Sequence, residues 1–411
     1  ENIYDKYYKE GGREGNPYDR TPLFNYRYSP ITADLAVVGA FAEVLLAKRL
    51  ANRRGVIGMN LLTKVQEPNM HTIYGAMQAG VDIVAMGAGI PADIPKYMRD
   101  MAEQKPIDFP ISVANATQDY FLKFDPERYK TDTDLRVPRF LMIITSHILA
   151  QRFKKHVVPP DGFIIEEPIA GGHNAPPRTP GNKAVALDET GQPIYTARDH
   201  ANMDTMRSLD VPYWLAGGYG SKEGLARAKA LGARGVQIGS IFALAEESGM
   251  AEHLKQRVIS EIRDGKGIDV YTDPLASPTG FPFKVARLEG TMSEPDVYEE
   301  RDRICDLGYL REAAEVTFVG RDGKEKKTVV YRCASEPIDD YLRKGGKIEQ
   351  TIGRKCICNS LVSTVGMGQV RENGQVEAPI MTIGDSVNDN VRAIDGPITV
   401  ETILASLRSN S

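Results

Sequence analysis

The feature of this sequence that most constrains its fold is a series of short apolar segments alternating with longer amphipathic ones. Each of the apolar segments shows little apolar–polar alternation, as expected for parallel strands covered on both faces. Helical periodicity fills the intervals, as in MHTIYGAMQAG and SKEGLARAKALGA. The series predicts an α/β fold with a parallel sheet, and its size favours a TIM-type (β/α) barrel over an open doubly wound sheet. The predicted strands are 56–60, 81–87, 109–115, 140–146, 162–168, 212–218 and 235–240.

Segments with other patterns flank this series and divide the chain into three expected parts. Residues 1–30 are rich in Tyr, Gly, Pro and Arg without a period, and they predict an irregular N-terminal arm. A helix is expected from Thr32, its predicted N-cap, and it opens a barrel domain at 31–268. From about residue 270 the strand–helix rhythm is lost, which indicates a smaller C-terminal unit at 269–411.

Composition and charge narrow the class of protein. The 411 residues are 42% apolar and 26% charged, close to the averages of folded soluble chains. The net charge of −4 comes from 51 bases and 55 acids mixed along the chain, which argues against nucleic acid as a partner. No window approaches 18 consecutive apolar residues, and the start lacks the pattern of a signal or transit peptide. We therefore expect a cytoplasmic protein without a membrane partner that acts on a small molecule. The oligomeric state stays open between a monomer and a homo-oligomer.

Glycines recur where the predicted strands end, which is the side on which α/β barrels bind their ligands. The last two strands end in AGGYGSKEG and VQIGS, at the pair of positions that most often holds phosphate in barrel enzymes. Backbone N–H groups near helix starts bind phosphate, and glycine lets a ligand approach the backbone closely. The pattern predicts a phosphorylated cofactor or substrate, although a glycine pair is also typical of a tight turn.

A histidine stands on such a glycine loop in the stretch EEPIAGGHNAPPR. His173 follows the strand at 162–168 and would project over the ligand-binding face, where an imidazole can transfer protons near neutral pH. The alternative is a loop histidine bonded to a backbone carbonyl, and the glycine context favours the catalytic interpretation. The Pro- and Gly-containing excursion at about 174–200 is long enough to predict a functional loop.

Several of these motifs, taken in order, resemble one family. The stretches GMNLL, MGAGIP, EEPIAGGHNAPPR, WLAGGYGSKEGLARAKALGARGVQIGS and FALAEESG are similar to those of the nitronate monooxygenase and 2-nitropropane dioxygenase family of FMN-dependent barrels. Relatives of that family include FMN-dependent enoyl reductases of fatty-acid and polyketide synthesis. The resemblance runs from about residue 55 to 250.

The resemblance implies FMN as cofactor and a role for individual residues. His173 corresponds to the family's catalytic histidine, and Asn60 corresponds to the asparagine that contacts the flavin after its strand. Glu166 and Glu167 stand where relatives often have Gln-Gly or Glu-Gly. The residues implied to bind the cofactor are Asn60, Gly87, Ser146, Glu167, Gly171, Gly172, Gly217, Gly218, Gln237, Gly239 and Ser240.

The chain departs from the family before residue 55, where no GGM-type strand and no second strand after it are recognisable. Either the first strands come from elsewhere, as in a fragment or processed form, or residues 1–30 replace them.

The cysteines are Cys305, Cys333, Cys356 and Cys358. They lack close C-x-x-C pairs, and a C-x-C on a strand would point its thiols to opposite faces, so we predict buried structural thiols rather than a zinc or iron–sulfur site.

Three functions are compatible with these observations. The first is an FMN-dependent oxidoreductase that oxidises small nitronates with dioxygen, with His173 as base or electrostatic partner. The second is an enoyl-thioester reductase in which the flavin takes hydride from NAD(P)H and His173 donates a proton. The third is a flavin-free barrel that holds a sugar phosphate on its glycine loops. The sequence favours the first.

Overall fold

The computed structural model describes residues 20–408 apart from 53, 133 and 180–184, together with Ile3, Tyr7 and Pro17. Most of the predicted arm at 1–30 therefore lies outside the described residues. Its final part contacts the C-terminal unit: Arg20 Nε lies 3.1 Å from Asp306 Oδ1, and Arg311 Nη2 donates to the Phe24 carbonyl at 2.5 Å.

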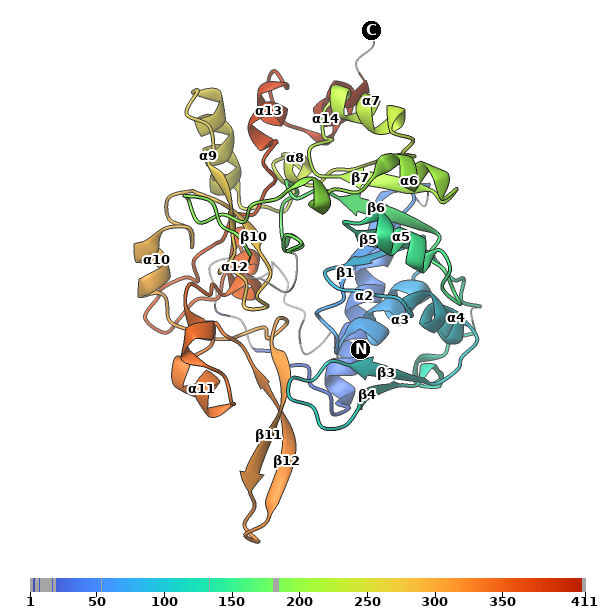
Figure 1. The fold of residues 1–411 in the computed structure, drawn as a ribbon, viewed down its shortest axis with the longest axis vertical. Coiled ribbons are helices and arrows are strands. Elements are labelled where there is room, and N and C mark those ends of the chain that lie inside the picture. Colours follow the sequence, from blue (N-terminus) through green and yellow to red (C-terminus); the bar gives the residue numbers. More distant parts are fainter. Residues whose placement is uncertain are drawn as a thin grey trace.

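A six-stranded parallel sheet forms the centre of the fold (Figure 1). Its order, β1-β2-β5-β6-β7-β8, follows the chain, so every strand pairs with the one before it in the sheet. A doubly wound sheet would reverse direction at a switch point, and this one does not. The α/β class and the parallel sheet are confirmed. Within the described part of the chain β8 does not pair with β1, so the sheet is a half-barrel. The strands are β1 (Gly58–Leu62), β2 (Ile83–Gly87), β5 (Arg139–Ile144), β6 (Gly162–Glu166), β7 (Tyr213–Ala216) and β8 (Gly235–Gln237).

One predicted strand lies outside this sheet. The segment expected at 109–115 forms β3 (Ile107–Ile111), which pairs antiparallel with β4 (Tyr120–Phe124) in a separate hairpin. Side chains along β3 alternate between buried and exposed, and Pro110 in its middle has no N–H to donate to a ladder. The placement in the parallel sheet was wrong because a proline and a one-sided burial pattern suit a two-stranded ribbon.

The first helix, α2 (Pro30–Leu50), begins two residues before the predicted start. Ser29 is its N-cap and Pro30 takes the first helical position, where the fixed φ of proline suits a helix. Thr32, the predicted cap, instead donates its hydroxyl to the Ser29 carbonyl at 3.1 Å. By length and composition alone, α2 is long and apolar enough to cross a membrane. In this fold, 28% of the residues in its most apolar 18-residue window are buried. Asp34 and Glu43 interrupt the apolar run, so no long uninterrupted apolar segment indicates this helix in the sequence.

Most of the remaining helices of the strand–helix region cover the outer face of the half-barrel (Figure 1). One large buried cluster joins α2 and the following helices to the sheet, with Tyr74, Phe140 and Phe163 among its fully buried side chains. These helices are α3 (Asn69–Gln78), α4 (Ile94–Ala102), α5 (His147–Phe153), α6 (Met203–Ser208) and α7 (Lys222–Ala230). The other two, α8 (Ser240–Ala243) and α9 (Glu252–Arg263), pack in a second buried cluster instead. Short 3₁₀ turns lie at Pro126–Tyr129, Ala197–Asp199 and Ile348–Thr351.

The C-terminal part contains two antiparallel hairpins and five helices among its described residues. The boundary predicted at 268/269 stays a prediction, and a buried cluster crosses it: Ile241 and Val258 pack together with Met381 and Val391. The elements are β9 (Val270–Asp273), β10 (Phe283–Ala286), α10 (Pro295–Glu300), β11 (Glu312–Val319), β12 (Glu325–Arg332), α11 (Ile338–Arg343), α12 (Ile357–Thr364), α13 (Val387–Arg392) and α14 (Val400–Arg408).

The crossing of α2 and α3 depends on Gly75. A Cβ at this position would lie 2.1 Å from the Val37 carbonyl oxygen, so Gly75→Ala should lower the free energy of unfolding by about 1–3 kcal/mol through overpacking. Gly39→Ala is the matched control, since its Cβ would meet nothing within 4 Å and should stabilise the helix by about 0.5–1 kcal/mol. Urea denaturation of the two variants measures both effects, and equal stability of both variants would show that the helices do not cross this closely.

Candidate functional site

Two adjoining cavities open at the carboxyl ends of the parallel strands. The larger has a volume of about 730 Å³ and the smaller about 360 Å³. Five residues line both cavities, so the two cavities adjoin, and an elongated ligand at this junction would extend into both. The residues that line both cavities are Glu166, Gly171, Gly172, Gln237 and Thr382.

The smaller cavity is a glycine cradle, as the sequence predicts for a phosphate site. Gly217, Gly218, Gly239 and Ser240 all line it. Gly217 and Gly218 have φ angles of +85° and +73°, a region that side chains other than glycine rarely adopt. Among the described residues, the backbone amides of Gly218, Gly239 and Ser240 have no acceptor. The cradle therefore offers free N–H groups to an anion.

The C-terminal part closes this cradle, which the sequence analysis did not foresee. Thr382 Oγ1 accepts a hydrogen bond from the Gly172 amide at 2.8 Å, and Ser240 Oγ accepts one from the Gly384 amide at 2.8 Å. Ser386 and Asn390 complete the lining from the start of α13. The small and polar residues of TIGDSVNDN were the signal available for this segment.

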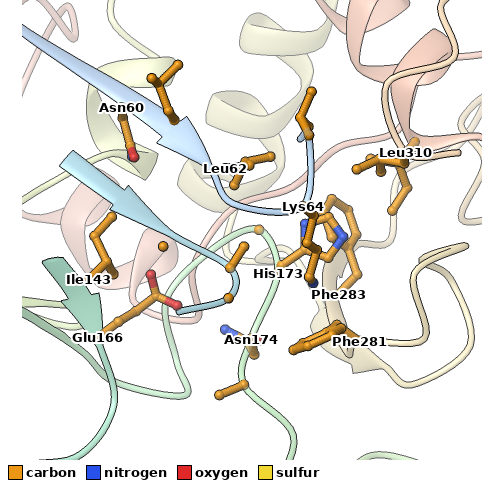
Figure 2. Close-up of a pocket in the computed structure, with 18 of the residues that line it drawn as sticks. Asn60, Leu62, Lys64, Ile143, Glu166, His173, Asn174, Phe281, Phe283 and Leu310 are labelled. Atoms are coloured by element: carbon orange, nitrogen blue, oxygen red, sulfur yellow. The ribbon is translucent and has the colours of Figure 1, made fainter. Parts of the chain in front are cut away.

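The larger cavity combines strand ends with an apolar wall. Asn60 lies in the middle of β1, which continues two residues beyond the predicted strand end, and Glu166 ends β6. These two side chains lie on one side of the cavity, while His173, Lys64 and Phe283 lie together on the other (Figure 2). The apolar wall comes from both parts of the chain: the strand–helix region supplies Leu61, Leu62, Ile143 and Leu149, and the C-terminal part supplies Phe281, Phe283, Leu310, Ile357 and Leu361. The C-terminal part thus completes the apolar enclosure of the polar groups at the strand ends.

His173 is held by an extended contact with β10. It forms a β-bridge with Phe283, and the two rings meet edge to face with centroids 4.9 Å apart. Its Nε2 lies 2.7 Å from Ser277 Oγ, while Nδ1 has no hydrogen-bond partner among the described residues. Burial, with a smaller effect of Lys64, lowers the pKa of His173 to about 3. The imidazole is therefore neutral near pH 7.

Lys64 lies beside this histidine and was not singled out from the sequence. Its Nζ sits 3.1 Å from the centroid of the Phe281 ring and 3.4 Å from Thr279 Oγ1. Within the described part of the chain it forms no ion pair, and burial lowers its pKa to about 7. A lysine after a strand end, in GMNLLTKV, was the available signal.

Burial also changes the charge of Glu166. Desolvation raises the pKa of its carboxyl to about 7, so near neutral pH it is present in both protonation states. It can therefore donate or accept a hydrogen bond at the junction of the two cavities. Among the described residues it has no side-chain partner of its own.

Two residues predicted to contact the cofactor do not line either cavity. Ser146 is buried and caps α5, where its hydroxyl accepts a hydrogen bond from the Ile148 amide at 3.2 Å. Glu167 points to the other side of the strand end and pairs with His200. Residues next to one another along a strand end face opposite ways, so Glu166 and Thr145 occupy the cavity instead. The other predicted residues line one or both cavities.

Of the four cysteines, Cys333 and Cys356 are buried, as predicted, and Cys305 and Cys358 are partly buried. Cys356 precedes α12 and Cys358 lies in its first turn, so the C-x-C segment is not a strand. All four thiols are free, and Cys358 lines the larger cavity. Burial raises the pKa of Cys358 to about 11 and that of Cys333 to about 12, which keeps both thiols neutral. Among the described residues, no group of three or more His, Cys, Asp or Glu side chains could hold a metal ion.

The paired cavities fit the parts of FMN. Free amides in the glycine cradle suit a phosphate, and Glu166, Gln237 and Thr382 at the junction suit the hydroxyls of a ribityl chain. The apolar cavity suits a flat aromatic ring. Its wall also holds Asn174, whose buried Oδ1 lacks a donor and could accept from a ring N–H.

Comparisons with known proteins agree with this fit. A family model described as nitronate monooxygenase matches residues 125–269, which is less than half of the chain and includes the His173 loop and the glycine cradle. No curated protein matches.

The similarity of this chain to the solved structures named below is low, both in sequence identity and in TM-score. FabK from Thermotoga maritima is 17% identical with a TM-score of 0.48, covering 92% of this chain and 86% of its own. The nitroalkane oxidase from Streptomyces ansochromogenes is 14% identical with a TM-score of 0.43, covering 94% of each chain. The enoyl reductase domain of MlnA from the macrolactin cluster of Bacillus amyloliquefaciens is 14% identical with a TM-score of 0.37, covering 64% of this chain and 60% of its own.

The cradle can be tested at Gly239. A Cβ there would meet nothing within 4 Å, so Gly239→Leu should leave the fold intact and place its side chain where the anion binds. Loss of charge-assisted hydrogen bonds, each worth about 1.5–3 kcal/mol, should weaken FMN binding by about 10-fold or more. Titration of the apoprotein, followed by quenching of FMN fluorescence, measures the affinity. Gly249→Leu is the control, because this exposed glycine is equally open and lines neither cavity. Unchanged affinity in the Gly239 variant would move the phosphate elsewhere.

Proposed function

We propose that this chain, whose residues 125–269 match a nitronate monooxygenase family model, is an FMN-dependent oxidoreductase that oxidises small nitronates with dioxygen as electron acceptor. Bound FMN would supply the electron transfer between the nitronate and dioxygen. The observation that carries the proposal is the pairing of neutral His173 with Lys64, which has no ion pair among the described residues, in a cavity that continues into the glycine cradle.

Charge favours an anionic substrate. A nitronate carries its negative charge on a compact group, and Lys64 is the cation that lines the larger cavity within the described part of the chain. An unpaired charge in an apolar cavity is costly, so a bound anion would stabilise the protonated lysine. The neutral His173 ring can then hydrogen-bond the substrate without adding a second positive charge.

The same arrangement also accepts a nitroalkane. His173 Nδ1, free of partners among the described residues, can take the α-proton when the imidazole presents a lone pair there. The apolar wall of Phe281, Leu310 and Ile357 would surround the alkyl part of the substrate. Exclusion of water by this wall strengthens the electrostatic contacts inside.

Oxygen uptake tests the proposal directly. A preformed nitronate of a small nitroalkane, added to the FMN-bound protein in an oxygen electrode, should cause uptake that depends on the nitronate concentration. No uptake with FMN bound would contradict the proposed activity.

The size of the apolar cavity, about 730 Å³, favours one second candidate. In it the protein would be an enoyl-thioester reductase, with NAD(P)H as electron donor and His173 donating the proton to the substrate. Rapid anaerobic bleaching of the flavin by NADPH would support this alternative, and a flavin indifferent to NADPH would remove it.

His173→Asn separates proton transfer from binding. Asparagine keeps a polar side chain of similar reach, so the FMN and the fold should be retained. Turnover of a nitroalkane should fall by about 10²-fold or more, because its α-proton must be removed, and turnover of the ready-made nitronate should fall less. Steady-state kinetics on the two substrates measure the ratio. Wild-type turnover of both would identify His173 as a structural loop residue.

A further inference from the structure

A chain of side chains connects His173 to Lys64 through two hydroxyl groups. Ser277 Oγ lies 2.7 Å from His173 Nε2, Thr279 Oγ1 lies 2.8 Å from Ser277 Oγ, and Lys64 Nζ lies 3.4 Å from Thr279 Oγ1. Ser277 is fully buried, so bulk water does not compete for its hydroxyl. Each hydroxyl can accept on one side and donate on the other, which is what a proton relay requires.

We propose that Lys64 is the proton reservoir for His173, connected to it through Ser277 and Thr279. The inference rests on the proposed function, because it assigns the destination of the proton that a nitroalkane must lose. The imidazole acts by exchanging its two neutral forms and never becomes an imidazolium ion.

The proton moves from the substrate to Lys64 in four transfers. The Cα–H bond of the nitroalkane breaks and its proton joins His173 Nδ1, while the proton on Nε2 passes to Ser277 Oγ. Ser277 gives its own proton to Thr279, and Thr279 gives its own to the neutral amine of Lys64. The electron pair of the broken bond remains on the substrate as the nitronate. The step thus creates the substrate anion and the lysine cation together, without net charge in the cavity.

Electrostatics support this direction. A His173 pKa of about 3 means that the ring cannot store a proton near pH 7, whereas Lys64, with a pKa of about 7, can. Deprotonated Lys64 is the accepting form, so the relay should operate as the pH rises through about 7.

Other titratable groups face the same cavity: Glu166, Tyr309 and Cys358 line it, and Arg354 donates to the Ser277 carbonyl at 2.6 Å. Glu166 also has a pKa near 7, but no electrostatic effect of Glu166 on His173 or Lys64 is resolved.

Turnover of four variants tests the relay. Preformed nitronate is the comparison substrate, because it has already lost the proton that the relay would carry. Thr279→Val, Ser277→Ala and Lys64→Met should each lower nitroalkane turnover by about 10-fold or more and abolish its rise near pH 7. The kcat of Thr279→Val and Ser277→Ala on the preformed nitronate should stay within about twofold of wild type, because no proton is removed. Lys64→Met should in addition raise the nitronate KM, because it removes the cation that binds the anion. Lys64→Arg keeps the charge but cannot accept a proton, so it should preserve the nitronate KM and still lose nitroalkane turnover.

The control for a lost hydroxyl is Thr291→Val. Thr291 is buried as deeply as Ser277, and its hydroxyl donates to the Leu288 carbonyl at 2.6 Å. It lies outside both cavities. It should change stability but not the ratio of nitroalkane to nitronate turnover. Nitroalkane turnover restored by Lys64→Arg, or unaffected by Thr279→Val, would overturn the relay. A wild-type protein inactive on nitronate would instead count against the proposed function.

A second measurement needs no substrate and no turnover. In the protein as purified, ¹⁵N shifts of the His173 ring report which nitrogen is protonated. Protonated Lys64 donates toward His173, which favours Nδ1–H, whereas neutral Lys64 favours Nε2–H. The tautomer should therefore switch near pH 7 in the wild type and in Glu166→Gln, and the switch should be absent in Thr279→Val. A tautomer that does not change between pH about 5 and about 9, or a switch that persists in Thr279→Val, would overturn the inference.

Discussion

The site depends on a short antiparallel contact between the loop after β6 and strand β10. The Lys284 amide donates to the Gly172 carbonyl at 2.8 Å, and the Asn174 amide donates to the Pro282 carbonyl at 2.9 Å. These two bonds flank His173, which pairs with Phe283 between them. The contact fixes the histidine ring, brings Ser277 and Thr279 to it, and places the apolar wall over the strand ends. Together with the hydrogen bond from the Gly172 amide to Thr382 Oγ1, the contact holds this loop, in which Gly172 has a φ of +86°, in one conformation.

Much of the parallel sheet was predictable because each strand carries its own local signal. Apolar segments with little alternation identified six strands to within a few residues, and the strand ends located His173 and the glycine cradle without knowledge of the tertiary fold. The same local reasoning misplaced β3, since its apolar content resembled that of a sheet strand and only pairing distinguishes the two. The family resemblance implied Glu167 rather than Glu166, and which of these two neighbours faces the cavity depends on the register of β6.

The residues that sequence reasoning missed come from the region after 270. Ser277, Thr279, Phe281 and Thr382 lie more than 100 residues from His173 along the chain, and no local periodicity connects them to it. Their positions follow from the β10 contact and from the buried cluster that packs α13 against α8 and α9. Lys64 was missed for a different reason. Its importance comes from having no ion pair among the described residues, which is a property of its surroundings and not of its own sequence.

The C-terminal part lines a cradle whose other residues are synthesised much earlier, so the site is completed late in synthesis. Domains generally fold as units as they leave the ribosome, N-terminal parts first. Here the strand ends that carry Asn60 and His173 are made early, but the cradle closes only when Thr382 and Asn390 have emerged, and α14 then packs against α7 and α8. Until that point the nascent half-barrel exposes the apolar ends of its strands to solvent. A translation product that stops before Thr382 would therefore carry nearly all of the recognisable motifs and still lack the enclosed site, so cofactor capture is expected only after this segment has emerged.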